Sequence, residues 1–244
     1  KYEKKNKTKR RDTMQIYGLN KTTLLDYPEH VAATVFCGGC NFRCPFCHNK
    51  GLIEGSCTRP TISEPEFFQF LKKRKGIISG VCITGGEPTL QPDLAEFIYR
   101  IKEQGFLVKL DTNGYRPEII EELTGGNLLD YIAMDIKSGP SGYGKASGIP
   151  EPDLEKIRRS IDFIMRCGVK YEFRTTVVKG IHTAGDFDEI GPMLQGAEVC
   201  FLQAYKAPEG NELPGLHSFD KGQMEDFAKR LRPFVRKAVL RGME

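Results

Sequence analysis

The feature of this chain that most restricts its fold is a regular alternation of short apolar runs and amphipathic helical segments. Six runs have the length and composition of strands: 32–37, 80–84, 107–111, 131–135, 171–178 and 199–204. Several are almost continuously apolar, as is typical of parallel strands covered on both faces. Helical segments separate them; one opens with a capping-box pattern at Ser63 and Glu66, and the last is expected from about 222 to 239.

Six such β/α units in 244 residues predict a parallel sheet with helices outside it. A closed eight-stranded barrel takes about 250 residues, so an incomplete, open six-stranded (β/α)6 barrel fits this chain better. We see no internal repeat and no linker, and therefore expect residues 14–244 to form one domain. In such folds the functional residues gather at the carboxyl ends of the strands.

Charge and hydropathy exclude several classes of function. The formal charge of +4 is concentrated in residues 1–12, which carry +5, so the rest of the chain sums to −1. We expect residues 1–13 to form a basic, flexible tail, either a solvated arm or a docking segment for an acidic partner or nucleic acid; the body has no nucleic-acid footprint. No run approaches the roughly 18 apolar residues of a membrane span, and no apolar signal segment follows the charged start. The expected compartment is the cytoplasm, with no membrane partner.

The eight cysteines are unevenly placed. Cys82 and Cys200 lie in strand-like runs and are expected to be small buried apolar residues. Half of the cysteines lie within eleven residues, at positions 37, 40, 44 and 47. A cytoplasmic chain with this distribution does not indicate a disulfide framework.

Cys40, Cys44 and Cys47 place three thiols on one short loop after the first predicted strand. Structural zinc usually takes two Cys-x₂-Cys pairs separated by a longer loop, and here only Cys37-x₂-Cys40 could complete such a set. One loop holds three corners of a [4Fe–4S] cluster more easily. The iron without a thiolate would then be free to bind a substrate. Neither Cys37 nor Cys57 receives a role from this pattern.

Polar motifs follow the next three predicted strands at the same expected edge. They are Gly85-Gly86-Glu87-Pro88, Asp111-Thr112-Asn113-Gly114 and Asp135-Ile136-Lys137. Asp135 and Lys137 alternate along an extended segment and therefore face the same side. This arrangement is explained either by binding of a zwitterionic ligand or by a simple ion pair between the two side chains. Arg174, in the fifth predicted strand, is a candidate to pair with a carboxylate.

The cysteine spacing, followed by Gly85-Gly86-Glu87-Pro88 at the next strand end, resembles the radical S-adenosylmethionine superfamily. The resemblance implies one [4Fe–4S] cluster on Cys40, Cys44 and Cys47, whose free iron chelates the amino and carboxylate groups of S-adenosylmethionine. The reduced cluster would pass one electron to the sulfonium and yield methionine and a 5′-deoxyadenosyl radical.

The same resemblance gives the rim motifs expected roles toward this ligand. Gly85 and Gly86 would allow close backbone approach, and Glu87 would accept from the ammonium. Phe46 would lie against the adenine ring or serve as a core aromatic. The remaining candidates are charged or polar: Asp111 and Thr112 for the methionine end or a bound cation, and Asp135, Lys137 and Arg174 for the charged groups.

Within the superfamily, residues 18–28 and Cys47-His48-Asn49 look most like activating proteins of anaerobic ribonucleoside-triphosphate reductase. This likeness implies abstraction of a hydrogen from a glycine Cα of a glycyl-radical enzyme, with a flavodoxin or ferredoxin-type electron donor. Residues 26–30 lack the Gly-Pro-Gly pattern of pyruvate formate-lyase activases, and residues 203–206 lack their histidine near the nucleoside. Between Cys47 and Gly85 only Cys57 is present, so no second cluster is expected.

Three alternatives stay open at this stage. The chain could activate a different glycyl-radical enzyme. It could act on a small molecule, as deazapurine-forming synthases of the superfamily do. It could also be a zinc or iron–sulfur binding module without catalysis.

Overall fold

The computed structural model describes residues 14–53, 62–207 and 214–243 of the chain. The predicted basic tail, residues 1–13, and Cys57 lie outside the described residues. The strands are β1 (Ile16–Thr23), β2 (Ala32–Cys37), β3 (Gly80–Gly85), β4 (Leu107–Thr112), β5 (Tyr131–Asp135), β6 (Lys170–Val177), β7 (Cys200–Ala204) and β8 (Ala238–Arg241). The helices are α1 (Lys50–Ile53), α2 (Glu64–Arg74), the 3₁₀ turn η1 (Pro88–Leu90), α3 (Leu94–Glu103), α4 (Pro117–Gly125), α5 (Tyr143–Ser147), α6 (Leu154–Arg166), α7 (Ala184–Met193) and α8 (Lys221–Leu231).

All of these strands form one sheet in the order of the sequence, from β1 to β8. Strands β2 to β8 are parallel, and β1 runs antiparallel to β2. The prediction of an open parallel α/β barrel is confirmed, and the six predicted strands are β2 to β7. The two edge strands, β1 and β8, were not predicted. The helix expected to reach 239 ends instead at Leu231. Arg232 still has helical backbone, but Pro233 has no amide hydrogen with which to continue the helical hydrogen-bond pattern.

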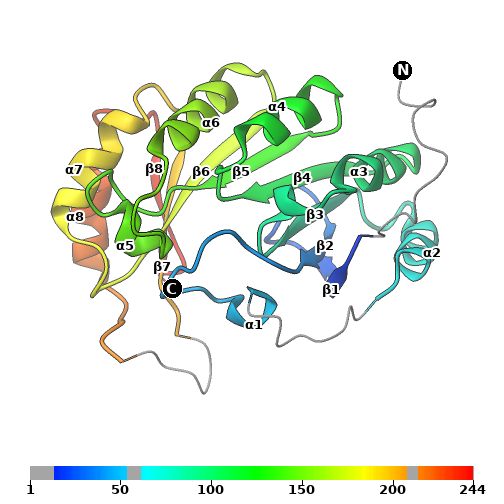
Figure 1. Ribbon diagram of the computed structural model, residues 1–244, viewed down its shortest axis with the longest axis horizontal. Coiled ribbons are helices and arrows are strands. Elements are labelled where there is room, and N and C mark those ends of the chain that lie inside the picture. Colours follow the sequence, from blue (N-terminus) through cyan, green and yellow to red (C-terminus); the bar gives the residue numbers. More distant parts are fainter. Residues whose placement is uncertain (1–13, 54–61, 208–213, 244) are drawn as a thin grey trace.

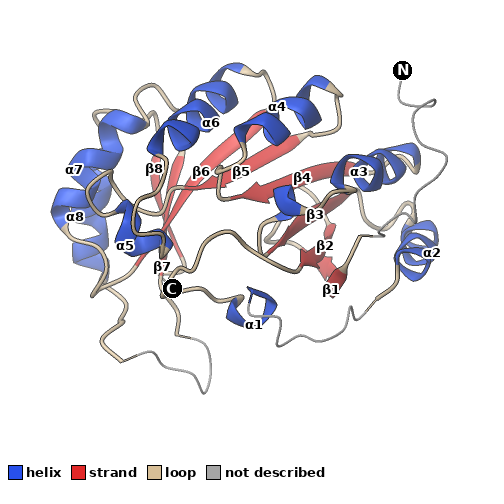
Figure 2. Cartoon of the chain, viewed as in Figure 1, coloured by secondary structure: helices blue, strands red, loops and turns tan. Residues whose placement is uncertain are grey.

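The helices α3, α4, α6, α7 and α8 form an outer layer along the sheet, whereas α1 and the loop that leads to it lie on the opposite side (Figure 1). Figure 2 shows this separation by element type, with the strands as a fan beneath the helices. The capping box predicted at the start of α2 is present, with Ser63 and Glu66 bonding reciprocally. In the described part of the chain, no helix has the length and apolarity that crossing a membrane would need.

Alternation along the strands gives the sheet an apolar outer face and a polar inner face. On β4, Val108 and Leu110 belong to the core beneath the helices, whereas Lys109 and Asp111 share the other face and pair with each other. The strands are therefore less apolar on their inner face than their sequence pattern predicts. Cys82 and Cys200 are fully buried, as expected.

The connection between β1 and β2 lies at the base of the open barrel, the end opposite the strand ends that carry the motifs. Because β1 is antiparallel to β2, Thr23 pairs with Ala32 at the amino end of β2, away from the strand ends that carry the motifs. Tyr27 is buried there, and a Cβ at Gly80 would lie 2.8 Å from its ring. Most of the segment that resembles reductase-activating proteins, residues 18–28, thus forms β1 and this base.

Candidate functional site

One pocket at the carboxyl ends of the parallel strands collects most of the residues predicted from sequence. Its walls include Cys40, Cys44, Phe46, Cys47, Gly85, Gly86, Glu87, Asp111, Thr112, Asp135 and Lys137. Arg174 is not part of the wall; it lies behind it, bonded to Asp111 and Asp135. The sequence assigned no ligand role to the other wall residues, although three of them belong to motifs quoted above. These residues are Phe42, His48, Asn49, Ile53, Thr84, Asn113 and Thr176.

The double glycine at the end of β3 holds the start of the cysteine loop. The amide of Gly86 donates to the carbonyl of Cys37 at 2.8 Å, and the amide of Glu87 donates to the carbonyl of Gly39 at 2.8 Å. A Cβ at Gly86 would lie 1.9 Å from the Gly39 oxygen, and Gly85 adopts a positive φ of 116°. Only glycine fits this approach. The two glycines therefore seat the loop, in addition to their predicted approach to a ligand.

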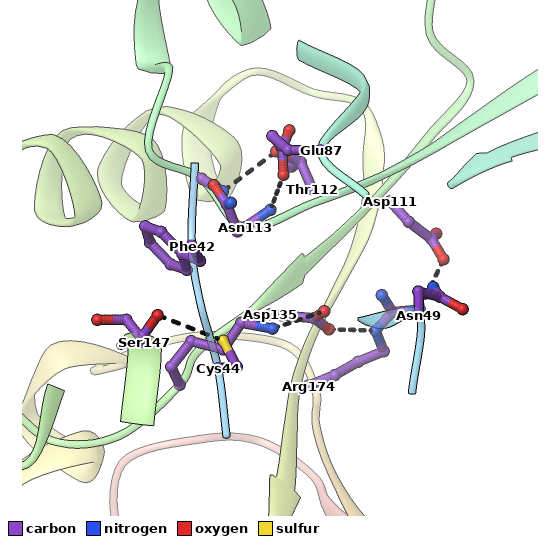
Figure 3. A network of polar contacts seen from close by, with 12 residues as sticks. Phe42, Cys44, Asn49, Glu87, Asp111, Thr112, Asn113, Asp135, Ser147 and Arg174 are labelled. Carbon is purple, nitrogen blue, oxygen red and sulfur yellow. Dashed lines mark hydrogen bonds and ion pairs between the residues drawn. The ribbon is translucent and has the colours of Figure 1, made fainter. Parts of the chain in front are cut away.

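Helix α5 holds the middle of the same loop. The carbonyl of Ser147 accepts a hydrogen bond from the Arg43 amide at 2.8 Å and a contact from the Cys44 thiol at 3.7 Å (Figure 3). Gly148 ends α5 in the left-handed region, with φ 71°, and a Cβ there would meet the Arg43 oxygen at 2.2 Å. The loop is thus fixed between two elements, β3 and α5, that are distant in sequence.

His48 and Asn49 anchor the end of the loop, a role that the sequence did not reveal. The side-chain amide of Asn49 donates to the carbonyl of Gly85 at 2.8 Å. The Nε2 of His48 lies 2.7 Å from the carbonyl oxygen of Lys206, and its ring stacks on Tyr205 with centroids 5.7 Å apart. Only their position directly after Cys47 in the sequence could have indicated that they hold the end of the loop.

Cys37 differs from the three loop cysteines. It pairs with Gly85 in the parallel ladder, is completely buried and belongs to the apolar core, and burial raises its pKa. Cys40 instead lines the pocket; burial raises its pKa to about 11, against a lowering hydrogen bond from the Phe42 amide. Among the described residues, no group of three His, Cys, Asp or Glu side chains surrounds one metal-ion position. The three loop thiols share one pocket wall, and this donor set fits an iron–sulfur cluster.

Glu87 is buried and joins η1 to the end of β4. Its Oε1 accepts from the Thr89 amide (3.1 Å), the Thr89 hydroxyl (2.5 Å) and the Thr112 hydroxyl (2.7 Å), and its Oε2 accepts from the Asn113 amide at 2.7 Å (Figure 3). Burial raises the pKa of this carboxyl, and these donors oppose the rise. A carboxylate has about four acceptor positions. Oε2 still has one acceptor position, so the predicted ammonium contact stays a prediction.

A row of paired charges lies next to Glu87. Arg174 donates from Nε to Asp135 at 2.8 Å and from Nη1 to Asp111 at 3.1 Å, and the second oxygen of Asp135 lies 3.2 Å from the Lys137 ammonium. Burial alone would raise the pKa of Asp135, but Arg174 and Lys137 lower it well below its usual value. Asp135 is therefore ionised at neutral pH, with an ammonium and a guanidinium beside it.

Phe46 belongs to the pocket wall, and His182 lies behind it, with the two ring centroids 5.8 Å apart. Phe46 is buried in a small apolar cluster with Ala146, Val178, Ile181 and Tyr205, and it still lines the pocket. His182, which the sequence did not single out, accepts the Val178 amide at Nδ1 (3.0 Å) and places Nε2 2.7 Å from the carbonyl oxygen of Lys137. Burial lowers the pKa of His182, so the ring is neutral and fixes the backbone at Lys137.

Comparisons with known proteins find chains that are similar in sequence. The sequence model of the Radical SAM superfamily matches residues 34–190. A "Putative glycyl-radical enzyme activating enzyme" of Methanocaldococcus jannaschii is 30% identical over 236 residues, covering 93% of this chain and 95% of the relative. A "Probable GTP 3',8-cyclase" of Pyrobaculum aerophilum is 28% identical over 170 residues, covering 67% of this chain and 54% of the relative.

Among solved structures, Streptococcus suis SuiB bound to precursor peptide SuiA superposes with a TM-score of 0.63 at 14% identity. The match covers 84% of this chain and 47% of that one. At this identity the likeness concerns the fold alone.

Proposed function

This chain belongs to the radical SAM superfamily, and on that premise we propose that it is an activase that installs a glycyl radical on a partner enzyme. The observation that carries the proposal is the nearly end-to-end match, over 93% of this chain, to a relative named as a glycyl-radical enzyme activating enzyme. The superfamily uses a [4Fe–4S] cluster and S-adenosylmethionine.

The pocket offers groups for both cofactors. Cys40, Cys44 and Cys47 would hold the cluster, which when bound supplies the electron that cleaves S-adenosylmethionine. The protein itself contributes by holding these groups in position. The β3 glycines and α5 keep the thiols in place, and the paired charges of Asp135 and Lys137 present opposite signs to a zwitterionic ligand.

Phe46 lies beside these groups and offers an apolar ring to the adenine. Glu87 and Thr112 would complete the methionine end. Asp111 lines the same pocket, but its carboxylate already pairs with Lys109 and Arg174, so the methionine end is favoured there over an added cation. Thr112 donates its hydroxyl to Glu87, so these two residues are placed as a unit.

For the partner, we propose a glycyl-radical enzyme resembling anaerobic ribonucleotide reductase, with a flavodoxin or ferredoxin-type electron donor. Support for this choice comes from residues 18–28 and from the Cys47-His48-Asn49 sequence. Residues 18–28 form most of β1 and the base of the open barrel, away from the pocket. They therefore support this choice of partner only through their resemblance to the subfamily.

A second candidate function is radical chemistry on a small molecule. The match to the cyclase of Pyrobaculum aerophilum favours it, although the chain spans only 54% of that relative. The two functions differ in the hydrogen donor, which is a protein backbone in the first and a free metabolite in the second.

The test is anaerobic incubation of the reconstituted protein with dithionite, S-adenosylmethionine and a candidate glycyl-radical reductase. We expect a lasting glycyl doublet in the electron paramagnetic resonance spectrum, and 5′-deoxyadenosine in proportion to it. Replacing the partner's radical-site glycine by alanine should abolish the doublet, and Cys44→Ala in this chain should do the same. A stoichiometric product formed from a small molecule without any partner polypeptide would instead support the second function.

A further inference from the structure

Lys109 is a buried lysine in the middle of β4 to which neither the sequence nor the proposed function gives a role. Its side chain is 1% exposed, and its ammonium pairs with Asp111. The same nitrogen lies 5.8 Å from the centre of the Tyr131 ring and 3.9 Å from the sulfur of Cys82. An ammonium removed from water is strongly destabilising unless it is well paired. The position of this lysine therefore depends on its ion pair with Asp111.

Lys109 is the inner end of a chain of alternating charges. Its ammonium contacts Oδ1 of Asp111, whose Oδ2 accepts from Arg174 at 3.1 Å; Arg174 donates to Asp135 at 2.8 Å, and Asp135 pairs with Lys137 at 3.2 Å. Figure 3 shows Asp111, Arg174 and Asp135 side by side, from three adjacent strands. Lys109 is 1% exposed and lies outside the pocket wall, whereas Asp111, Asp135 and Lys137 line it, so a buried cation is connected to the wall through these pairs.

Three carboxylates lie close to the Arg174 guanidinium. Besides Asp111 and Asp135, Glu172 lies 3.8 Å from its Nη1. Glu172 is itself held by Arg241 at 3.3 Å and by the hydroxyl of Tyr131 at 3.2 Å. Guanidinium groups favour bidentate contact with a single carboxylate. Without Lys109, both oxygens of Asp111 would be open to Arg174, and a bidentate contact there would draw Arg174 away from Asp135.

We propose that Lys109 is a positioning residue for the S-adenosylmethionine site and acts through Asp111. By occupying Oδ1 of Asp111, it leaves only Oδ2 to Arg174, and Arg174 then holds the Asp135 carboxylate at the pocket wall. This inference rests on the proposed ligand role of Asp135 and Lys137.

The test is a double-mutant cycle on the cluster-loaded protein. S-adenosylmethionine binding is titrated by anaerobic calorimetry, without reductant, in Lys109→Met, Asp111→Asn and the double variant at equal iron content. We expect Lys109→Met to weaken binding about tenfold, equal to about 1.4 kcal/mol, and to weaken it far less in the Asp111→Asn background, because residues that act together are not additive. Lys109→Arg should restore affinity to within a few-fold, since it keeps a cation on Oδ1.

The matched control is Lys102→Met, which removes a lysine–aspartate pair on the outer layer, where Lys102 binds Asp130 at 2.6 Å. It should lower the unfolding temperature without changing affinity. If Lys109→Met does not fold, Lys109→Gln takes its place in the cycle.

The two proposals fail in different ways. Unchanged affinity in Asp135→Asn would overturn the ligand site itself. Weakened binding in Asp135→Asn together with wild-type affinity in Lys109→Met, or with additive effects of Lys109 and Asp111, would overturn only the role of Lys109.

Discussion

Replacing Gly86 by alanine should unseat the cysteine loop. The added Cβ would lie 1.9 Å from the carbonyl oxygen of Gly39 and 2.7 Å from its carbon, and both atoms belong to the backbone, so neither can rotate away. The strand end and the loop must then separate. That movement breaks the hydrogen bonds from Gly86 to Cys37 and from Glu87 to Gly39.

The cost follows from these contacts. Each lost backbone hydrogen bond contributes about 1 kcal/mol, and forcing an extra methyl group into a packed site costs about 1–3 kcal/mol. A total of about 3 to 5 kcal/mol lowers the Tm of a domain of this size by roughly 6–20 °C. Because Cys40 follows the displaced Gly39 directly, cluster occupancy should fall as well.

The assay combines unfolding of the apo protein with iron and sulfide counts after reconstitution. Gly125→Ala is the matched control: Gly125 is in α4, nothing lies within 4 Å of its added Cβ, and the change should be neutral or stabilise by about 0.5–1 kcal/mol. A Gly86→Ala protein that melts with the wild type and takes up a full cluster would refute the steric argument.

Three further results are expected. Cys40→Ala should lose the cluster and Cys37→Ala should keep it, measured as iron and sulfide per chain; the reverse pattern would contradict the ligand assignment. Asp135→Asn and Lys137→Ala should each weaken S-adenosylmethionine binding about 10- to 100-fold at constant cluster content, because a lost charged hydrogen bond costs about 1.5–3 kcal/mol; calorimetry decides this. Since burial lowers the pKa of His182, its contribution to stability is full above about pH 6.5 and declines as the pH falls below that value. Between pH 8 and 5, the free energy of unfolding, measured with denaturant, should fall less for His182→Gln than for the wild type. Equal falls in the two proteins would contradict the role of His182 in this pH dependence.

The order of strands followed from the sequence, and so did the expectation that functional residues gather at the carboxyl ends of these strands. Apolar runs of strand length, separated by amphipathic segments, allow few arrangements other than a parallel α/β sheet. The cysteine spacing is equally local, and so is the capping box at Ser63, which the structure reproduces. The edge strands β1 and β8 escaped prediction, because an edge strand is defined by the neighbour it pairs with and its own apolar pattern is weak.

Several assignments at the site depended on packing between distant segments. Cys37 and Cys40 are three residues apart, yet only the ladder with Gly85 puts the first in the core. His182 and Lys109 carry no motif, and their roles appear only once β4, β5 and β6 are in register.

The sequence by itself determined the open parallel barrel, its thiol loop and the strand ends that carry polar motifs, because periodicity and spacing are properties of neighbouring residues. Only the tertiary structure decided which charges pair. Asp111 and Arg174 are 63 positions apart, and their contact depends on strand register and on the cost of leaving a buried charge alone. That cost selects one network, Lys109 to Lys137, from the many pairings that the composition would allow.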